Sequence, residues 1–253
     1  MTKRFDLLSD ALGLRRGCLL ALVGGGGKTS ALLTLSRELA DSGWRVVAST
    51  TTRVGSSVEA SMPVLETTGK RLPDGLVRAM AGPRRVFLCA GRGEDGKLLG
   101  TDPQLLDAIK ARDLADAIIV EADGARRMPL KAPGDHEPII PEAADIVAPF
   151  AGLDALGSAI ETGIVHRPEF LKSLTASDRV TPEAIADVLC ADAGGMKGVP
   201  AGARVCPVLN KLDTLAREES LAVAHAVLSR RPDRIPQVLL TSLQSGEFLR
   251  VQR

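Results

Sequence analysis

Two hydrophobic patterns alternate along the chain. The first is a short apolar run, which is typical of a strand buried on both faces of a parallel sheet. The second is an apolar residue at every third or fourth position, which is typical of a helix with one buried face. The strands predicted from the first pattern span residues 19–23, 45–49, 63–66, 85–90, 117–120, 145–150, 204–209 and 238–243.

Helical periodicity occupies most of the segments between these strands. In the segment after the first strand, Leu32, Leu35 and Leu39 share one face, and Gly43 follows as a natural stop. The predicted helices span residues 5–14, 29–41, 75–81, 102–111, 153–160, 166–174, 181–189 and 215–230. Strands that alternate with helices over 253 residues predict one domain, residues 1–253, with a doubly wound α/β fold and a mainly parallel sheet.

A run of four glycines joins the strand at 19–23 to the helix at 29–41. It reads Gly24-Gly25-Gly26-Gly27-Lys28-Thr29-Ser30. The order of strand, glycine loop, Lys-Thr and helix is that of a phosphate-binding P-loop. We expect residues 24–30 to bind phosphate, because glycine lets the backbone approach a polyphosphate and the helix N-terminus attracts it. Lys28 is expected on the outer phosphates and Thr29 on a magnesium ion.

The loop is shorter than the common G-x-x-x-x-G-K-[ST] form. Leu22 occupies the position of the first glycine, so the spacing is Gly24-x-x-Gly27. This shorter spacing resembles the ATP loop of the Mur ligases. The alternative is a flexible glycine turn followed by an ordinary lysine, which leaves the order of strand, loop and helix unexplained. The loop does not itself select a nucleotide.

Acidic residues end the predicted strand at 117–120. Glu121 and Asp123 follow at alternate positions, so a continuing strand turns both carboxylates to one side. Acids at this point beside a P-loop hold magnesium and position an attacking water. We expect Glu121 and Asp123 to be catalytic with Lys28, and to hold the metal with Thr29. The alternative is a strand that ends in solvated acids.

Hydroxyl groups follow the predicted strand at 45–49, as Thr50, Thr51 and Thr52. Ligands of parallel sheets bind outside the carboxyl ends of the strands. Any of the three threonines is therefore placed to reach a phosphate or a magnesium ion. The alternative is that threonine simply suits a strand end.

A basic segment rich in proline follows the acidic strand end. It contains Arg126, Arg127 and Lys131, with prolines at positions 129, 133, 138 and 141 that exclude a regular helix or a central strand. We interpret this segment as a switch or partner-docking loop. His136 within it is either a base or metal ligand, or a loop histidine with a structural hydrogen bond.

A third motif follows the late strand at 204–209. Residues 210–213 read Asn-Lys-Leu-Asp and fit the Asn-Lys-x-Asp motif of GTP-binding proteins. A carboxylate accepts from both N1–H and the amine of guanine, while the asparagine fixes the loop and the lysine stem covers the base. The alternative is a helix start capped by Asp213 or Thr214. The residues expected to bind the base are Asn210, Lys211, Asp213, Thr241 and Ser242.

Composition narrows the partners that these motifs can serve. The net charge is +1 and aromatic residues make up 2% of the chain, so neither a basic field nor stacking platforms favour nucleic acid. No apolar run reaches the length of a membrane span and no signal peptide opens the sequence. We therefore expect no membrane partner and a cytoplasmic location.

The motifs together resemble those of the YqeC family. After the P-loop and the threonines come Val-Glu-Ala-Asp-Gly at 120–124, His-Glu-Pro at 136–138, His-Arg-Pro-Glu at 166–169 and Asn-x-x-Asp at 210–213. The resemblance extends from Val23 to about Ser242. Members are described as selenium-dependent hydroxylase accessory or selenium cofactor biosynthesis proteins. The resemblance implies a cytoplasmic P-loop protein whose partners are a molybdenum hydroxylase or its cofactor-assembly proteins.

These features predict a magnesium-dependent protein that binds a purine nucleoside triphosphate, GTP rather than ATP. We expect slow hydrolysis, or transfer of a phosphoryl or nucleotidyl group, in the maturation of molybdenum hydroxylases. One alternative is an ATP-dependent ligase or kinase for a small molecule, favoured by the short loop and by Glu121. Another is a non-catalytic chaperone that uses nucleotide as a switch.

Overall fold

A central sheet organises the computed structural model, which describes residues 1–161 and 163–253. Among these residues, eleven strands contribute to the sheet. They are β1 (Thr2–Phe5), β2 (Cys18–Gly24), β3 (Val46–Thr50), β5 (Val64–Glu66), β6 (Arg85–Cys89), β8 (Ala117–Glu121), β10 (Ile146–Gly152), β12 (Arg204–Val205), β13 (Val208–Asn210), β14 (Gln237–Ser242) and β15 (Glu247–Gln252).

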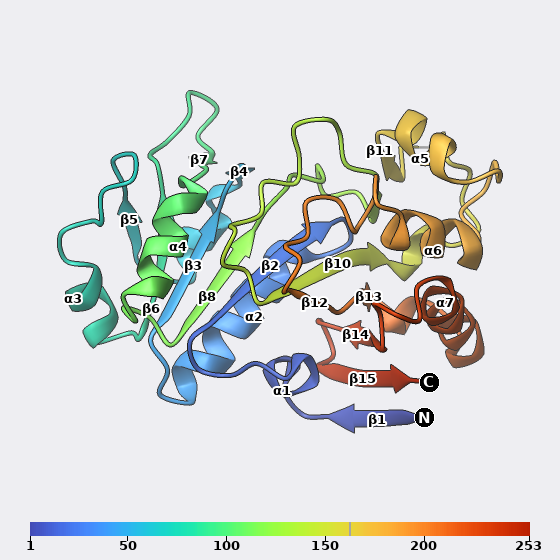
Figure 1. The fold of residues 1–253 in the computed structure, drawn as a ribbon, viewed down its shortest axis with the longest axis horizontal. Helices are drawn as coiled ribbons and strands as arrows, with labels where there is room; N and C mark the ends of the chain where they lie inside the picture. Colours follow the sequence, from blue (N-terminus) through green and yellow to red (C-terminus); the bar gives the residue numbers. More distant parts are fainter. Residues whose placement is uncertain (162) are drawn as a thin grey trace.

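The strands follow the order β1-β15-β14-β13-β10-β2-β8-β3-β6-β5, with β12 paired to β10 (Figure 1). Every pair from β14 to β5 is parallel, whereas β15 and β1 are antiparallel to their neighbours. Two small sheets lie beside the main one. They pair β4 (Arg53–Val54) with β7 (Leu98–Leu99), and β9 (Leu130–Lys131) with β11 (Val165–His166).

Helices cover both faces of the sheet. They are α1 (Leu8–Leu12), α2 (Lys28–Asp41), α3 (Leu76–Ala81), α4 (Pro103–Ala111), α5 (Pro168–Leu174), α6 (Pro182–Cys190) and α7 (Arg217–Arg230). Three short 3-10 turns are η1 (Ser56–Ala60), η2 (Leu153–Ala155) and η3 (Leu212–Thr214).

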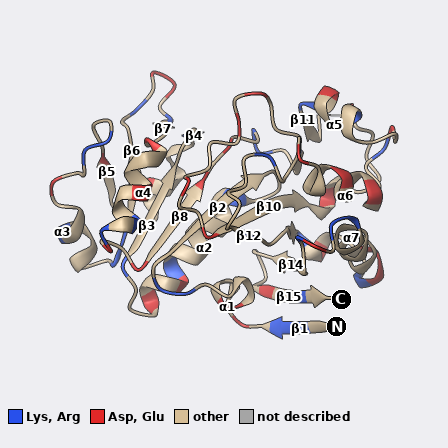
Figure 2. Cartoon of the chain, in the orientation of Figure 1, with Lys and Arg blue, Asp and Glu red and all other residues tan. Residues whose placement is uncertain are grey.

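Alternate residues of each strand belong to different hydrophobic clusters. On β2, Leu20 and Leu22 pack with the apolar residues of α1 and α2, while Leu19 and Ala21 pack with those of α3 and α4. The side chains of α6 and α7 pack on Ala151 of β10 and on β13 and β14. Figure 2 shows the central strands largely free of charged residues, which gather on the surrounding loops and helices. The chain therefore has the predicted doubly wound α/β fold with a mainly parallel sheet.

The two chain ends depart from the predicted elements. The helix predicted at 5–14 is shorter, because residues 2–5 form β1 and pair with β15, a strand that was not predicted. The guanidinium of Arg250 lies 4.4 Å from the ring centroid of Phe5, which joins the two terminal strands. Short terminal strands that contain several polar residues carry only a weak local signal, so the pairing of β1 with β15 is visible only in the folded chain.

Two internal predictions were also wrong in detail. The strand predicted at 204–209 is interrupted between β12 and β13, because Pro207 has no N–H to donate to a ladder. The weak helix predicted at 153–160 is only the 3-10 turn η2. By contrast, Thr181 caps α6 as predicted, since its Oγ1 accepts from the Ala184 N–H at 3.2 Å.

A partly buried carboxylate, that of Asp116, links the amino ends of β2, β3 and β8 through Arg16 and Arg45. The Asp116 carboxylate accepts from the Arg45 N–H at 2.7 Å and lies 2.8 Å from Arg16 Nη1. Burial raises the pKa of Asp116, but the hydrogen bonds from Arg45 and Arg16 outweigh it and lower this pKa from 3.8 to about 2.

We expect Asp116→Asn to lower the free energy of unfolding by roughly 2 kcal/mol at pH 7, since one pKa unit corresponds to about 1.4 kcal/mol. The folded pKa lies below the unfolded one, so this stabilisation is present above about pH 4 and is lost as the pH falls toward 2. Urea unfolding across that range measures it. Asp113→Asn is the control, because Asp113 hydrogen-bonds Arg45 through its backbone carbonyl and its carboxylate acts on Arg45 less than that of Asp116 does. Equal stability of wild type and Asp116→Asn at pH 7 would contradict the prediction.

Candidate functional site

The glycine loop lies at the carboxyl edge of the sheet, between β2 and α2. β2 runs between β8 and β10, and the register pairs Leu22 with Glu121 and Gly24 with Phe150. Ligands of parallel α/β sheets bind outside this edge. The loop is therefore placed where the acidic end of β8 and the end of β10 both reach it.

The backbone N–H groups of the loop divide into two sets. Those of Gly24, Gly25 and Gly26 are used inside the protein, by Asp123 and by the carbonyls of Phe150 and Met128. Those of residues 27–30 have no acceptor within the described part of the chain. They are the first N–H groups of α2, so they form a positive anion-binding end. We expected all of residues 24–30 to bind phosphate. The N–H groups of residues 24–26 already have acceptors within the protein, so those of residues 27–30 are the ones left for an anion.

Close packing requires glycine in this loop. Gly26 has φ +86°, and a Cβ there would lie 2.2 Å from the Gly152 nitrogen. Gly27 has φ +123°, and a Cβ there would lie 2.4 Å from the Asn210 amide nitrogen. Both positions combine a left-handed backbone with a neighbour in direct contact, which only glycine accommodates. The glycines therefore frame the loop as well as permit approach of a ligand.

Lys28 lies under the loop and faces both predicted acids. Its Nζ is 3.1 Å from Asp123 Oδ1 and 3.7 Å from Glu121 Oε1, and it donates to the Gly24 carbonyl. Burial lowers the pKa of Lys28, but the charges of Asp123 and Glu121 outweigh burial and raise this pKa above its usual value. The ammonium therefore stays charged beside the anion-binding end of α2.

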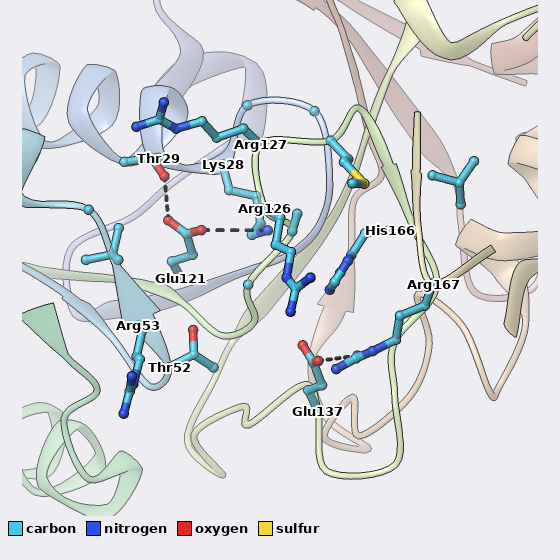
Figure 3. A pocket seen from close by; sticks show the side chains of 18 of the residues that line it. Lys28, Thr29, Thr52, Arg53, Glu121, Arg126, Arg127, Glu137, His166 and Arg167 are labelled. Carbon is cyan, nitrogen blue, oxygen red and sulfur yellow. Dashed lines mark hydrogen bonds and ion pairs between the residues drawn. The ribbon is translucent and has the colours of Figure 1, made fainter. Parts of the chain in front are cut away.

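Glu121 joins the strand end to the first turn of α2. The Thr29 hydroxyl donates to Glu121 Oε2 at 2.8 Å, and both residues line the cleft described below (Figure 3). Burial raises the pKa of Glu121, although the nearby Lys28 charge and the Thr29 hydrogen bond oppose that effect. A hydroxyl and a carboxylate in contact are hard oxygen donors of the kind that magnesium prefers.

Asp123 occupies a different place from Glu121. Both of its carboxylate oxygens lie 3.0 Å from the Gly24 nitrogen, and Oδ2 is 2.9 Å from Lys131 Nζ. It is 1% exposed and lines a small second cavity with Gly24 and Lys131. The structure thus uses Asp123 to hold the loop from behind, while Glu121 faces the cleft.

Asn210 at the end of β13 connects the third motif to the loop. Its Nδ2 donates to the Gly26 carbonyl at 2.8 Å, and its Oδ1 accepts from the Thr241 hydroxyl at 3.1 Å. Thr241 and Ser242 are fully buried, so they support Asn210 and the turn that follows rather than the cleft surface. The Asn210 side chain is thereby held between the glycine loop and the end of β14.

Lys211 and Asp213 of the third motif are less buried than Asn210. Lys211 lines the cleft and lies 2.5 Å from Asp154 Oδ2. Asp213 is exposed, and its carboxylate has no hydrogen-bond or ion-pair partner among the described residues. The alternative that Asp213 or Thr214 caps the next helix is wrong, because α7 starts after Ala216.

The three threonines after β3 have separate roles. Thr50 donates to the Glu121 carbonyl at 2.9 Å and Thr51 to the Ile139 carbonyl at 2.7 Å. Thr52 alone of the three lines the cleft. Two of these hydroxyls therefore support neighbouring backbone, and Thr52 is the one placed to reach a ligand.

A cleft of about 1500 Å³ opens in front of the loop. Thr29 and Glu121 form part of one wall, and Arg126, Glu137, His166 and Arg167 lie on another (Figure 3). In the sequence, Arg126 stood out as part of the basic segment. Glu137, His166 and Arg167 stood out only as members of the family motifs at 136–138 and 166–169.

His136 also lines the cleft, and its side chain has no hydrogen bond within the described residues. The alternative that His136 makes a structural hydrogen bond therefore has no bonding partner among the described residues. Within the part of the chain that the structure describes, no three His, Cys, Asp or Glu side chains gather as a metal site. A metal ion here would depend on ligand phosphates and water in addition to Thr29 and Glu121.

A family model described as YqeC protein matches residues 20–169. The chain is also 33% identical over 211 residues to the uncharacterized protein YqeC of Escherichia coli (strain K12), covering 81% of this chain and 80% of that protein. The chain belongs to the YqeC family. The matched region includes the glycine loop and both acids, and also Arg126, Glu137, His166 and Arg167.

Solved structures with a related arrangement are more distant than this family. FtsY from Mycoplasma mycoides matches with a TM-score of 0.46 and 13% identity, over 90% of this chain and 62% of that one. McdA from Cyanothece, solved with ATP, matches with a TM-score of 0.39 and 13% identity, over 90% and 87%.

The site has the parts of a P-loop nucleotide-binding protein. Four kinds of group meet at one edge of the sheet: the Lys28 ammonium, the Thr29 hydroxyl, the Glu121 carboxylate and the N–H groups of residues 27–30, which have no acceptor among the described residues. Of the helices in the described residues, none is both long and apolar enough to cross a membrane.

We expect Asp123→Asn to lower the free energy of unfolding by about 3 to 5 kcal/mol, because it leaves the buried Lys28 and Lys131 short of a carboxylate. Urea unfolding at neutral pH measures the loss. Asp154→Asn is the matched control: it also removes a carboxylate from a lysine, Lys211, but both side chains are about a third exposed, and such pairs contribute at most about 1 kcal/mol. Equal losses in the two variants would show that Asp123 has no special structural role.

Proposed function

We propose that this protein binds magnesium and a purine nucleoside triphosphate, with GTP preferred over ATP, and hydrolyses it slowly. We further propose that it acts in the cytoplasm as an accessory protein in the maturation of molybdenum hydroxylases, including those that carry selenium. Family membership supports the pathway, and the site supports the nucleotide. All 253 residues are proposed to form one domain, since the strands at the two chain ends pair in the main sheet.

The observation that carries the nucleotide proposal is the hydrogen bond from Asn210 to the Gly26 carbonyl at 2.8 Å. It fixes the base-reading motif against the phosphate loop, so one ligand can span both. Lys211 is then beside the cleft to cover a base. Asp213 is exposed and unpartnered within the described residues, which leaves its carboxylate available for the N1–H and amine of guanine.

Each residue of the loop has a distinct task in this proposal. The N–H groups of residues 27–30 and the Lys28 ammonium bind the outer phosphates. Thr29 and Glu121 would hold magnesium, directly or through water, and the ion would neutralise charge on the phosphates. Asp123 is a positioning residue, because its carboxylate is occupied by Gly24, Lys28 and Lys131.

We expect Glu121→Gln to weaken magnesium-dependent triphosphate binding by about 10- to 100-fold, as when a metal site loses a supporting carboxylate. Gln keeps an acceptor for Thr29, and burial disfavours the charged form of Glu121, so the free energy of unfolding should stay equal or rise. Calorimetric titration with and without magnesium gives the first quantity and urea unfolding the second. Unchanged magnesium dependence in the folded variant would remove Glu121 from the metal site.

We expect wild type to bind GTP roughly tenfold to several hundredfold more tightly than ATP. Asp213 is exposed in the free protein, but an adenine bound over it would shield its carboxylate from water and offer it no donor, at a cost of about 1 to 3 kcal/mol. Asp213→Asn should weaken GTP and shift preference toward xanthosine triphosphate, whose extra carbonyl accepts from an amide donor.

The same calorimetric titrations test this ranking, with Asp233→Asn as a control at another exposed aspartate. A wild type that prefers ATP would contradict the GTP proposal and favour the ligase or kinase alternative. An unchanged ranking in Asp213→Asn would show that this residue does not read the base.

A further inference from the structure

The cleft is larger than most pockets that hold one small ligand. Its volume is about 1500 Å³, whereas pockets for one small ligand usually measure about 300 to 1,000 Å³. The proposed nucleotide uses the wall formed by the glycine loop and the start of α2. The opposite wall, which we call the second wall, consists of Arg126, Glu137, His166 and Arg167.

The second wall is anchored to the phosphate loop by a chain of buried charges. Lys131 is completely buried at its side chain and pairs with both Asp123 and Glu137. Glu137 pairs in turn with Arg167 at the start of α5. β11, which carries His166, pairs with β9, which carries Lys131. A wall built on such a network is held in place before any ligand arrives.

Arg126 is the free cation of this wall. Its guanidinium has no ion pair or hydrogen bond among the described residues. Arg126 and Arg127 both have left-handed backbone, with φ of 49° and 63°. Figure 3 shows their side chains diverging, with Arg127 extending toward the side of Thr29 and Arg126 lying beside His166. Arg127 therefore faces the nucleotide side of the cleft, and Arg126 faces the second wall.

The charges that act most strongly on His166 are mainly positive, although Glu161 and Glu169 also line the cleft. Burial lowers the pKa of His166, and the charges of Lys131, Arg167 and Arg126 lower it further, against the opposing effect of Glu137. Three cations thus act on one imidazole, and one carboxylate partly offsets them. An arginine fork without a partner among such charges is suited to phosphate or carboxylate oxygens.

We propose that the second wall binds a second substrate through an oxyanion, a phosphate monoester or a carboxylate, beside the bound nucleotide. Arg126 binds the oxyanion directly, and Arg167, held by Glu137, contributes the second positive charge. This inference rests on the proposed function, because it makes the second substrate the acceptor or effector of the nucleotide reaction. It places the specificity of the protein in the motifs around His136 and His166 rather than in the glycine loop.

The test uses the full-length protein saturated with magnesium and a non-hydrolysable GTP analogue, so that the phosphate loop is occupied. Inorganic phosphate and acetate are then titrated separately by calorimetry, and the tighter of the two identifies the class of oxyanion. We expect saturable binding in wild type and a loss of about 10- to 100-fold in Arg126→Gln, as for one charge-assisted hydrogen bond. Arg126 is exposed, so this variant should fold and keep its affinity for the analogue.

Arg53→Gln is the matched control, since Arg53 also lines the cleft but pairs with Asp95 outside the second wall. Weakening in Arg126→Gln alone supports the proposal. Neither anion binding to the loaded protein would overturn it, while analogue binding would still uphold the proposed function. Anion binding that the analogue abolishes would also overturn it, because the cations would then belong to the triphosphate site. A protein that binds no analogue would overturn both proposals.

Discussion

The site depends on one buried carboxylate, that of Asp123. Its two oxygens accept from the Gly24 N–H and meet the ammonium groups of Lys28 and Lys131. A single anion buried between two cations avoids the large cost of leaving any of the three charges unpaired. Because the same carboxylate touches the glycine loop, Lys28 and the basic segment, these three parts of the chain hold one relative position.

The parallel sheet brings Glu121 and Asn210 to the same edge as this carboxylate. The register sets the ends of β2, β8, β10 and β13 side by side, so residues almost 200 positions apart in the sequence meet at one edge. Asn210 uses this proximity to bind the Gly26 carbonyl. Burial raises the pKa of Glu121 even though Lys28 and the Thr29 hydroxyl contact its carboxylate. A carboxylate with a raised pKa at a cleft is typical of a functional position.

Local sequence patterns predicted the central strands, the helix after the loop and the identity of the loop. They succeeded because each rests on neighbouring residues: an apolar run, a helical period, a glycine run before Lys-Thr. The separate roles of Glu121 and Asp123 were not predictable in this way. They depend on Lys131, which the sequence placed in an open basic loop and the fold buries.

Long-range pairing explains the other differences. β1 and β15 come from opposite ends of the chain and stabilise each other only after both are placed. Residues 137, 166 and 167 meet at the second wall through ion pairs and a two-residue strand, which leave no periodic pattern in the sequence. Thr241 and Ser242 were correctly placed at the end of a strand, but the fold turns them inward to support Asn210.

A crystal structure of the wild-type protein with magnesium and a non-hydrolysable GTP analogue tests the central claim most directly. We expect the outer phosphates within hydrogen-bond distance of the N–H groups of residues 27–30, and Lys28 Nζ moved from the Gly24 carbonyl to a phosphate oxygen. Asp123 should keep its contacts with Gly24 and Lys131. An analogue bound elsewhere, with Lys28 still on the Gly24 carbonyl and the four N–H groups without a phosphate, would contradict the claim.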